Sequence, residues 1–155
     1  MPAPPRPTSP APARHYSVPD ADALVPYLTE TFAEIAEDRA QLSTLVDTLA
    51  DEGLDLLEEV AVDDVTDPRF APRFARVMTY QRQIRDRLQA VEALGAEVRD
   101  LDGRVEVASR YNGRDVYLCW ELGDPAFDHW REVDADVTER LRVGDFTKFT
   151  GSWLN

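Results

Sequence analysis

The sequence contains little cysteine and no long apolar run. Cys119 is the single cysteine, so one chain cannot form an internal disulfide, and this fits a reducing compartment. No apolar stretch approaches the ~20 residues that a membrane-spanning helix needs. These absences argue against a disulfide-stabilised fold and against an integral membrane protein, and we expect a cytoplasmic protein.

Basic residues are scarce relative to acidic ones. The chain has 17 Lys and Arg against 30 Asp and Glu, which gives a formal net charge of -13. Nucleic acids and anionic membrane surfaces attract proteins through basic side chains that neutralise phosphates, so we expect neither as a partner. A local basic patch around Arg82, Arg85 and Arg87 is the alternative, and a solvated helix face explains these arginines more simply.

Several catalytic motifs are missing as well. The sequence has no Gly-rich phosphate loop, no Ser-His-Asp arrangement and no Cys-x-x-Cys pair. These absences favour a protein that is not an enzyme and that carries no cofactor.

Proline is concentrated at the start of the chain. The first 14 residues, MPAPPRPTSPAPAR, lack the apolar centre of a secretory signal, and their composition predicts an extended, disordered tail. The remaining residues, 15–155, suffice for one domain with one modest core.

Two helices are predicted on either side of an acidic segment, residues 51–68, which favours no single structure. The first covers about 18–50, because Ser17 and Asp20 have the spacing of a capping box and Pro26 predicts a short turn and a kink before a long helix. The second covers about 69–94 and ends before Gly95. Apolar residues follow the helical period in both: Leu28, Phe32, Ile35, Leu42, Val46 and Leu49, then Phe70, Phe74, Val77, Ile84, Leu88 and Val91.

Each apolar stripe is interrupted once by a polar residue. In an antiparallel hairpin of two regular helices Leu49 lies near Phe70, and Arg39 then faces Gln81. We interpret this pair as a polar core layer that fixes the register of the helices. An anion-binding arginine inside the bundle is the alternative, and no neighbouring residue supports it.

Beyond Gly95 the pattern changes to the alternation of β-strands, predicted over about 97–122. Asn112-Gly113 is a strong signal for a two-residue hairpin turn. In the last strand Val116, Leu118 and Trp120 point to one face and Tyr117, Cys119 and Glu121 to the other. Because both faces carry apolar or aromatic residues, we expect this strand to be covered on both sides, one of them by the C-terminal segment or a second subunit.

The same strand supplies the predicted structural core, Leu118, Cys119 and Trp120. A nucleophilic cysteine needs a nearby base or helix N-terminus to lower its pKa, and a position in the middle of a strand provides neither locally. We therefore predict that Cys119 is a small buried core residue.

The C-terminal segment, residues 124–155, contains the candidate metal ligands. His129 lies three residues before Glu132, a spacing that on a helix puts both side chains on one face. Asp128 is a further candidate ligand, and Asp124, Asp134 and Asp136 add oxygen donors nearby. Because acidic chains often contain such patterns by chance, a divalent metal site here is the alternative hypothesis.

The segment from Gly113 to Trp130, GRDVYLCWELGDPAFDHW, carries a family resemblance. It resembles the part of the prokaryotic domain-of-unknown-function family DUF2203 that usually reads G-R-E-V-Y-L-C-W-R-L-G-E, followed by Trp-His-Glu. The resemblance extends from Tyr16 to about Arg142 and implies an architecture rather than a chemistry. This chain has Trp130-Arg131-Glu132 where the family usually has Trp-His-Glu, with Asp136 and Leu141-Arg142 in place of a Gly and a Gln-Pro. The missing histidine argues against transferring an enzymatic role.

We expect an α+β fold in which a long antiparallel helical hairpin packs against a small antiparallel β-sheet. The leading hypothesis is a non-enzymatic, homo-oligomeric interaction or scaffold protein of the bacterial cytoplasm, most simply a dimer whose second copy covers the remaining apolar faces. The alternatives are a small metal-binding protein or metalloenzyme that uses His129 and Glu132, and an acidic surface that mimics another partner. No substrate follows from the sequence.

Overall fold

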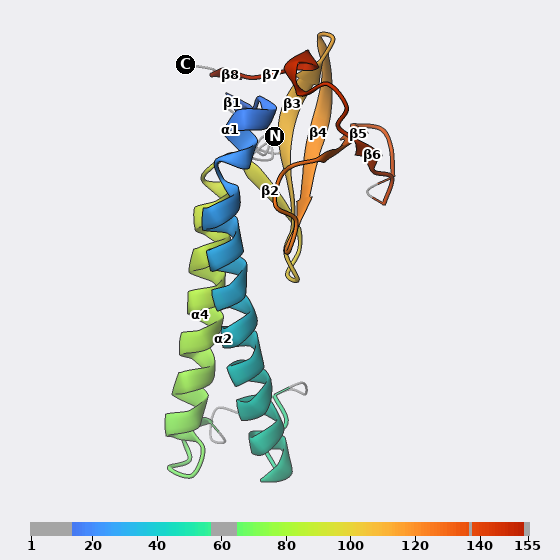
Figure 1. Ribbon diagram of the computed structural model, residues 1–155. Helices are drawn as coiled ribbons and strands as arrows, with labels where there is room; N and C mark the ends of the chain where they lie inside the picture. Colours follow the sequence, from blue (N-terminus) through green and yellow to red (C-terminus); the bar gives the residue numbers. More distant parts are fainter. Residues whose placement is uncertain (1–13, 57–64, 137, 154–155) are drawn as a thin grey trace, which may run out of the picture. The chain divides into compact units, whose positions relative to one another are not determined.

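The computed structural model describes residues 14–56, 65–136 and 138–153 (Figure 1). It combines helices with antiparallel strands, so the predicted α+β class is confirmed. The helices are α1 (Val18–Asp22), α2 (Val25–Asp51) and α4 (Ala71–Glu92), with a short 3-10 helix η1 (Phe146–Lys148) near the C-terminus. The chain divides into two compact units, a helical unit of residues Ala33–Gln89 and a sheet unit that holds the residues up to Phe32 and those from Ala90 onward.

The start of the helical region follows the predicted signals. Ser17 is the N-cap of α1, and its hydroxyl oxygen accepts a hydrogen bond from the amide of Asp20 at 3.2 Å. Pro26 is the second residue of α2, where its missing N–H leaves no helical hydrogen bond unmade. The predicted break before the long helix is therefore confirmed. No described helix is both long and apolar enough to cross a membrane.

Apolar side chains from α2, α4 and the residues that flank them form the core of the helical unit. The buried members are Leu45, Leu49, Leu54, Phe70 and Val77. Arg87 of α4 forms ion pairs with Asp38 and, at 3.1 Å, with Glu34, both on α2. A second ion pair joins Arg73 of α4 to Glu52, the residue after α2. Of the three arginines considered for a basic patch, Arg87 is thus neutralised by acids.

The predicted polar layer of Arg39 and Gln81 needs correction. Gln81 is exposed and Arg39 is half-buried, whereas the buried charged residue of α2 is Asp38. Tyr80, three residues after Val77, packs on the apolar cluster at the place that the prediction gave to Gln81. The prediction failed because it derived the register from helix spacing alone, and the observed contacts pair Asp38 with Arg87 instead.

The sheet unit contains a six-stranded antiparallel sheet. Its order is β2 (Ala96–Asp100), β3 (Arg104–Tyr111), β4 (Arg114–Glu121), β5 (His129–Glu132) and β6 (Leu141–Arg142), and β7 (Phe149–Thr150) also pairs with β3. Asn112 and Gly113 both have positive φ, 50° and 80°, as the predicted two-residue turn between β3 and β4 requires. The prediction ended the sheet at residue 122 and missed the strands formed by the C-terminal segment.

The N-terminal boundary of the fold also needs a small correction. Arg14 was assigned to the tail, but β1 (Arg14–His15) pairs with β8 (Ser152–Trp153) in a separate two-stranded sheet. The amide of Tyr16 then donates to the carbonyl of Ala108 at 2.7 Å, which attaches this segment to β3. Residues 1–13 of the predicted tail lie outside the described residues.

One face of the sheet is the apolar core of the sheet unit. Val105 and Val107 on β3 lie opposite Trp120 and Leu118 on β4, and all four are buried. The Trp120 ring lies 6.2 Å from that of Phe32 on α2 and 6.4 Å from that of Phe127, measured between centroids. The start of α2 and the loop before β5 therefore cover this face.

Candidate functional site

The opposite face of the sheet carries charged residues at its centre. The strand register places Glu106 of β3 opposite Cys119 of β4, and Arg131 of β5 opposite Tyr117 of β4. Residues directly opposite each other share a face, so these four side chains lie together. Glu106 is completely buried and the side chain of Arg131 is only 4% exposed.

Glu106 and Arg131 form a bidentate ion pair. Arg131 Nε donates to Glu106 Oε2 at 2.5 Å, and Nη2 donates to Oε1 at 2.9 Å. Arg99 of β2 donates from Nε to the same Oε1 at 2.5 Å. The remaining Arg131 nitrogen, Nη1, donates to the carbonyl of Ala135 at 3.0 Å, so the segment after β5 satisfies its free side.

These contacts hold both members of the pair in their charged forms. Burial raises the pKa of the Glu106 carboxyl, but hydrogen bonds from Arg131, Cys119 and Arg99 outweigh burial and keep the pKa below its usual value. The hydrogen bond to Glu106 raises the pKa of Arg131. A carboxylate held in this way cannot serve as a proton donor near neutral pH, and we assign the cluster a structural role.

Cys119 belongs to the same cluster. Its thiol lies 3.0 Å from Glu106 Oε2, to which it donates a hydrogen bond, and the residue is completely buried. Burial, followed by the interaction with the Glu106 carboxylate, raises the pKa of the thiol to about 12. Cys119 therefore lacks the thiolate that a nucleophile needs, and Leu118 and Trp120 beside it are buried as well.

We expect the Cys119 thiol to react with a disulfide reagent at pH 8 about 1,000-fold more slowly in the native protein than in the unfolded chain, because a pKa near 12 lowers the thiolate fraction by that factor. The rate of labelling with dithiobis(nitrobenzoate) measures this directly, since the chain has one cysteine. The same assay in guanidinium chloride is the control. Prompt labelling of the native protein would show that the thiol is accessible and ionised.

The predicted pair of metal ligands, His129 and Glu132, is not brought together. Both residues lie in strand β5, where side chains alternate between the two faces, so positions three apart point in opposite directions. The prediction required a helix after Pro125, and this segment is a strand that pairs with β4. The helical spacing argument therefore does not apply.

Another acidic group does lie near His129. Atoms of Asp124, Asp128 and His129 are within 4.8 Å of one another, and all three residues are half-buried. Asp128 contacts the His129 ring at 2.8 Å. Asp124 already accepts hydrogen bonds from the amide of Glu121 at 3.0 Å and from Arg140 at 3.3 Å. These contacts account for Asp124 without a cation, and metal binding by this group stays a hypothesis.

The comparison with protein families matches the architecture described above. Residues 14–143 match the family model described as "Uncharacterized conserved protein (DUF2203)", close to the range of the resemblance seen in the sequence. No curated protein and no solved structure gives a significant match. The family match includes α1, α2, α4 and strands β1 to β6, so the chain belongs to the DUF2203 family of uncharacterized conserved proteins.

Proposed function

We propose that the protein is a non-enzymatic, homodimeric interaction protein of the cytoplasm. The observation that carries this proposal is a pair of exposed leucines in two turns that are hydrogen-bonded to each other at one end of the sheet. Leu101 is 42% exposed and Leu122 is 39% exposed. The amide of Leu122 donates to the carbonyl of Gly103 at 2.8 Å, which fixes the turn after β4 against the turn between β2 and β3. A second copy would remove this apolar pair from water.

Two other apolar surfaces that had suggested a dimer are accounted for within the chain. The apolar stripes of α2 and α4 contribute to the buried cluster of the helical unit. The second face of β4 is covered at Cys119 by Glu106 and Arg131. The support for a dimer therefore rests on the exposed leucines and not on the helices.

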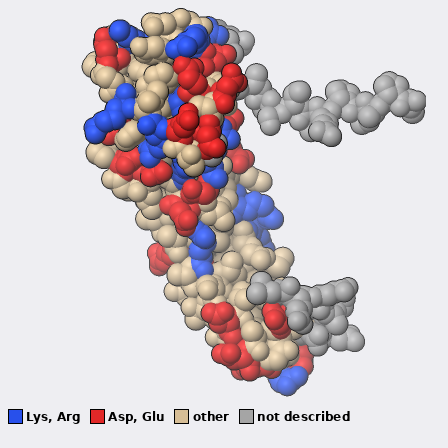
Figure 2. Space-filling model, turned by 90° about the vertical axis from the view of Figure 1, so that its right-hand side faces the viewer, with Lys and Arg blue, Asp and Glu red and all other residues tan. Residues whose placement is uncertain are grey.

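A non-enzymatic role is supported by the way in which the reactive side chains are used. Cys119 and Arg131 both bond to Glu106, and Asp124 is bonded to Arg140. A mimic of an acidic partner has less support, since acidic and basic side chains are interspersed on the face that Figure 2 shows. We also expect no nucleic-acid or membrane partner, on the basis of the net charge of -13.

We infer further that α2 and α4 form the antiparallel helical hairpin predicted from the sequence. The ion pair of Asp38 with Arg87 and that of Glu52 with Arg73 support this arrangement, because Glu52, which follows Asp38 in the sequence, is matched with Arg73, which precedes Arg87 on α4. The packing of the hairpin against the sheet stays a prediction.

We expect light scattering at micromolar concentration to give about twice the chain mass of 17.5 kDa, because one copy leaves Leu101 and Leu122 exposed. The substitution Leu122→Asp should weaken the dimer at least tenfold, since it brings like charges together across a two-fold interface. Met78→Asp is the matched control, because Met78 is 46% exposed on α4, outside the proposed interface. A monomeric mass for the parent at every concentration would contradict the proposal.

A further inference from the structure

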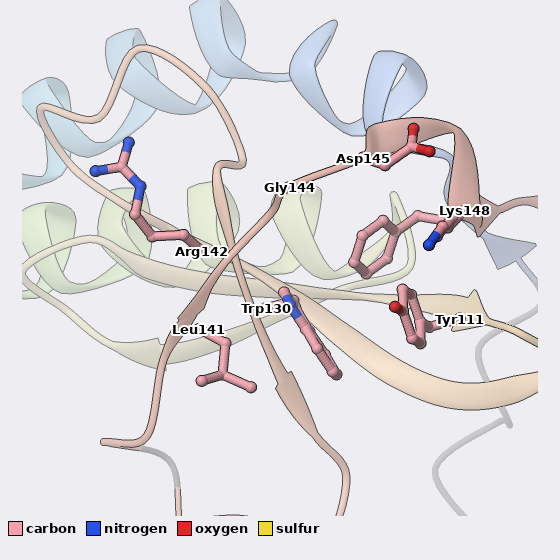
Figure 3. Close-up of a pocket in the computed structure, with 8 residues that line it drawn as sticks. Tyr111, Trp130, Leu141, Arg142, Gly144, Asp145 and Lys148 are labelled. Atoms are coloured by element: carbon pink, nitrogen blue, oxygen red, sulfur yellow. The ribbon is translucent and has the colours of Figure 1, made fainter.

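The sheet unit contains a pocket that the proposed function does not use. It lies on the side of the sheet that carries Tyr111 of β3, Trp130 of β5 and Leu141 of β6, and the segment between β6 and β7 closes it (Figure 3). Its volume is about 360 Å³, which is within the range of small-molecule sites. The pocket is therefore large enough for a ligand of one or two rings.

Aromatic rings form the wall of this pocket. The Tyr111 and Trp130 rings are stacked with their centroids 5.1 Å apart and their planes 21° from parallel. Phe149 contacts both rings, with its ring centroid 5.0 Å from that of Tyr111 and 5.7 Å from that of Trp130, and is itself buried. Tyr111 and Trp130 both line the pocket and are only half-buried, so part of this stacked pair is exposed to it.

Lys148 lines the pocket, and the guanidinium carbon of Arg114 lies 5.8 Å from the centroid of the Tyr111 ring. Figure 3 shows the side chain of Lys148 ending near Tyr111, whereas the side chain of Arg142 extends away to the other side. The register agrees, because Leu141 pairs with Trp130 and the next residue of a strand points to the opposite face. Lys148 is the only lysine in the chain, in which every other basic residue apart from the two histidines is an arginine.

The charge of Lys148 is available to a ligand. Among the described residues its ammonium group makes no hydrogen bond or ion pair within 4 Å. The nearby Asp145 carboxylate accepts hydrogen bonds from the Thr147 amide at 3.0 Å and hydroxyl at 2.5 Å. These two bonds, with a smaller contribution from the nearby charge of Lys148, hold the pKa of Asp145 below its usual value. The Asp145 carboxylate is hydrogen-bonded to Thr147 rather than to Lys148, so the ammonium group keeps its hydrogen-bonding capacity for an anion.

We propose that this pocket binds a small aromatic carboxylate, with its ring against Tyr111 and Trp130 and its carboxylate on Lys148. The aromatic wall contributes apolar contact area, and the ammonium group contributes a charge-assisted hydrogen bond that a neutral ligand lacks. A carboxylate fits better than a phosphate, because one lysine matches one negative charge and phosphate sites gather several donors.

Gly144 is one of the residues that line the pocket. Its backbone is not in the left-handed region that favours glycine, and a β-carbon placed on it would have no neighbour within 4 Å. Neither backbone conformation nor packing therefore requires glycine at this position. Since Gly144 lines the pocket and its Cβ position is free, we expect a large side chain here to occupy part of the pocket without a clash, which makes Gly144→Phe a blocking variant and Gly144→Ala its matched control.

The single lysine allows a site-specific test. Protein labelled with 15N-lysine alone gives one backbone amide signal, that of Lys148. We expect 2-naphthoate to shift this signal with a dissociation constant below about 1 mM, and 2-naphthalenemethanol, which has the same ring without the charge, to bind about fivefold to tenfold more weakly. Inorganic phosphate should give no saturable shift of the Lys148 signal below about 10 mM, which is tenfold above the limit expected for naphthoate.

Variants distinguish this site from binding elsewhere. Binding to these variants is followed on the NMR signals of the ligand. Lys148→Gln should reduce naphthoate binding to the level of the alcohol. Gly144→Phe should abolish binding of both probes, whereas Gly144→Ala should retain it. Equal binding of acid and alcohol, tighter binding of phosphate, unchanged binding in Gly144→Phe, or no shift would each overturn the proposal. The mass of the same samples tests the dimer separately, because Leu101 and Leu122 do not line the pocket.

Discussion

The variant Arg131→Met is expected to lower the free energy of unfolding by about 3 to 5 kcal/mol, the usual cost of removing one partner of a buried ion pair. Methionine retains most of the apolar length of the side chain, so the loss reports on the charge. Glu106 would remain completely buried, with Arg99 as its only cationic partner among the described residues. Urea unfolding followed by circular dichroism measures the change.

Two further variants separate this effect from a general loss of sheet stability. Arg114→Met on β4 removes an arginine that is 57% exposed and pairs with Glu132 at 3.0 Å, and it should cost less than about 1 kcal/mol. The double variant Arg131→Met with Glu106→Gln should be more stable than Arg131→Met alone, because no unpaired carboxylate remains. If Arg131→Met costs no more than Arg114→Met, the cluster does not contribute as described.

The stabilisation by Glu106 should depend on pH in one direction. The pKa of Glu106 in the folded protein lies below its ordinary value of 4.5, so its ionised form stabilises the fold above that pH. The contribution is lost as the pH falls through the folded-state pKa. The difference in stability between the parent and Glu106→Gln should therefore shrink as the solution is acidified below about pH 4.

The features that could be predicted from the sequence depend on neighbouring residues. The cap at Ser17, the break before Pro26 and the turn at Asn112-Gly113 each follow from the backbone preferences of a few residues. The alternation in β4 likewise separated Leu118 and Trp120 from Cys119, because the two faces of a strand follow from its period of two.

The features that were missed depend on contacts between distant segments. The register that pairs Asp38 with Arg87 is set by contacts between two helices, which the spacing within each helix does not contain. Strand β5 has four residues, too few to distinguish alternation from a helical period, and it forms by pairing with β4. The buried cluster had no local signal, since Glu106 between Val105 and Val107 fits the alternation of a strand with one solvated face. Its burial follows from the contacts with Cys119 and Arg131 on neighbouring strands.

Removal of the indole by Trp120→Ala should cost about 3 to 5 kcal/mol in the free energy of unfolding, as for other large aromatic side chains deleted from a core. Trp120 is completely buried between the rings of Phe32 and Phe127. Its Nε1 also donates to the carbonyl of Asp124 at 2.9 Å, which ties β4 to the turn that follows it. The loss therefore combines a cavity with an unsatisfied carbonyl.

Trp120→Phe separates these two contributions. Phenylalanine keeps most of the apolar contact with Phe32 but cannot donate to Asp124, so we expect it to cost about 1 to 3 kcal/mol, the range for a smaller cavity and one lost hydrogen bond. Trp130→Phe is the control on the same face of the sheet, because Trp130 is only half-buried and should tolerate the change better. If Trp120→Ala unfolds at the same urea concentration as the parent, Trp120 is not in the core. If instead only Trp130→Phe is strongly destabilising, the rings around the pocket form the core of the sheet unit, and the apolar face described here has been assigned to the wrong residues.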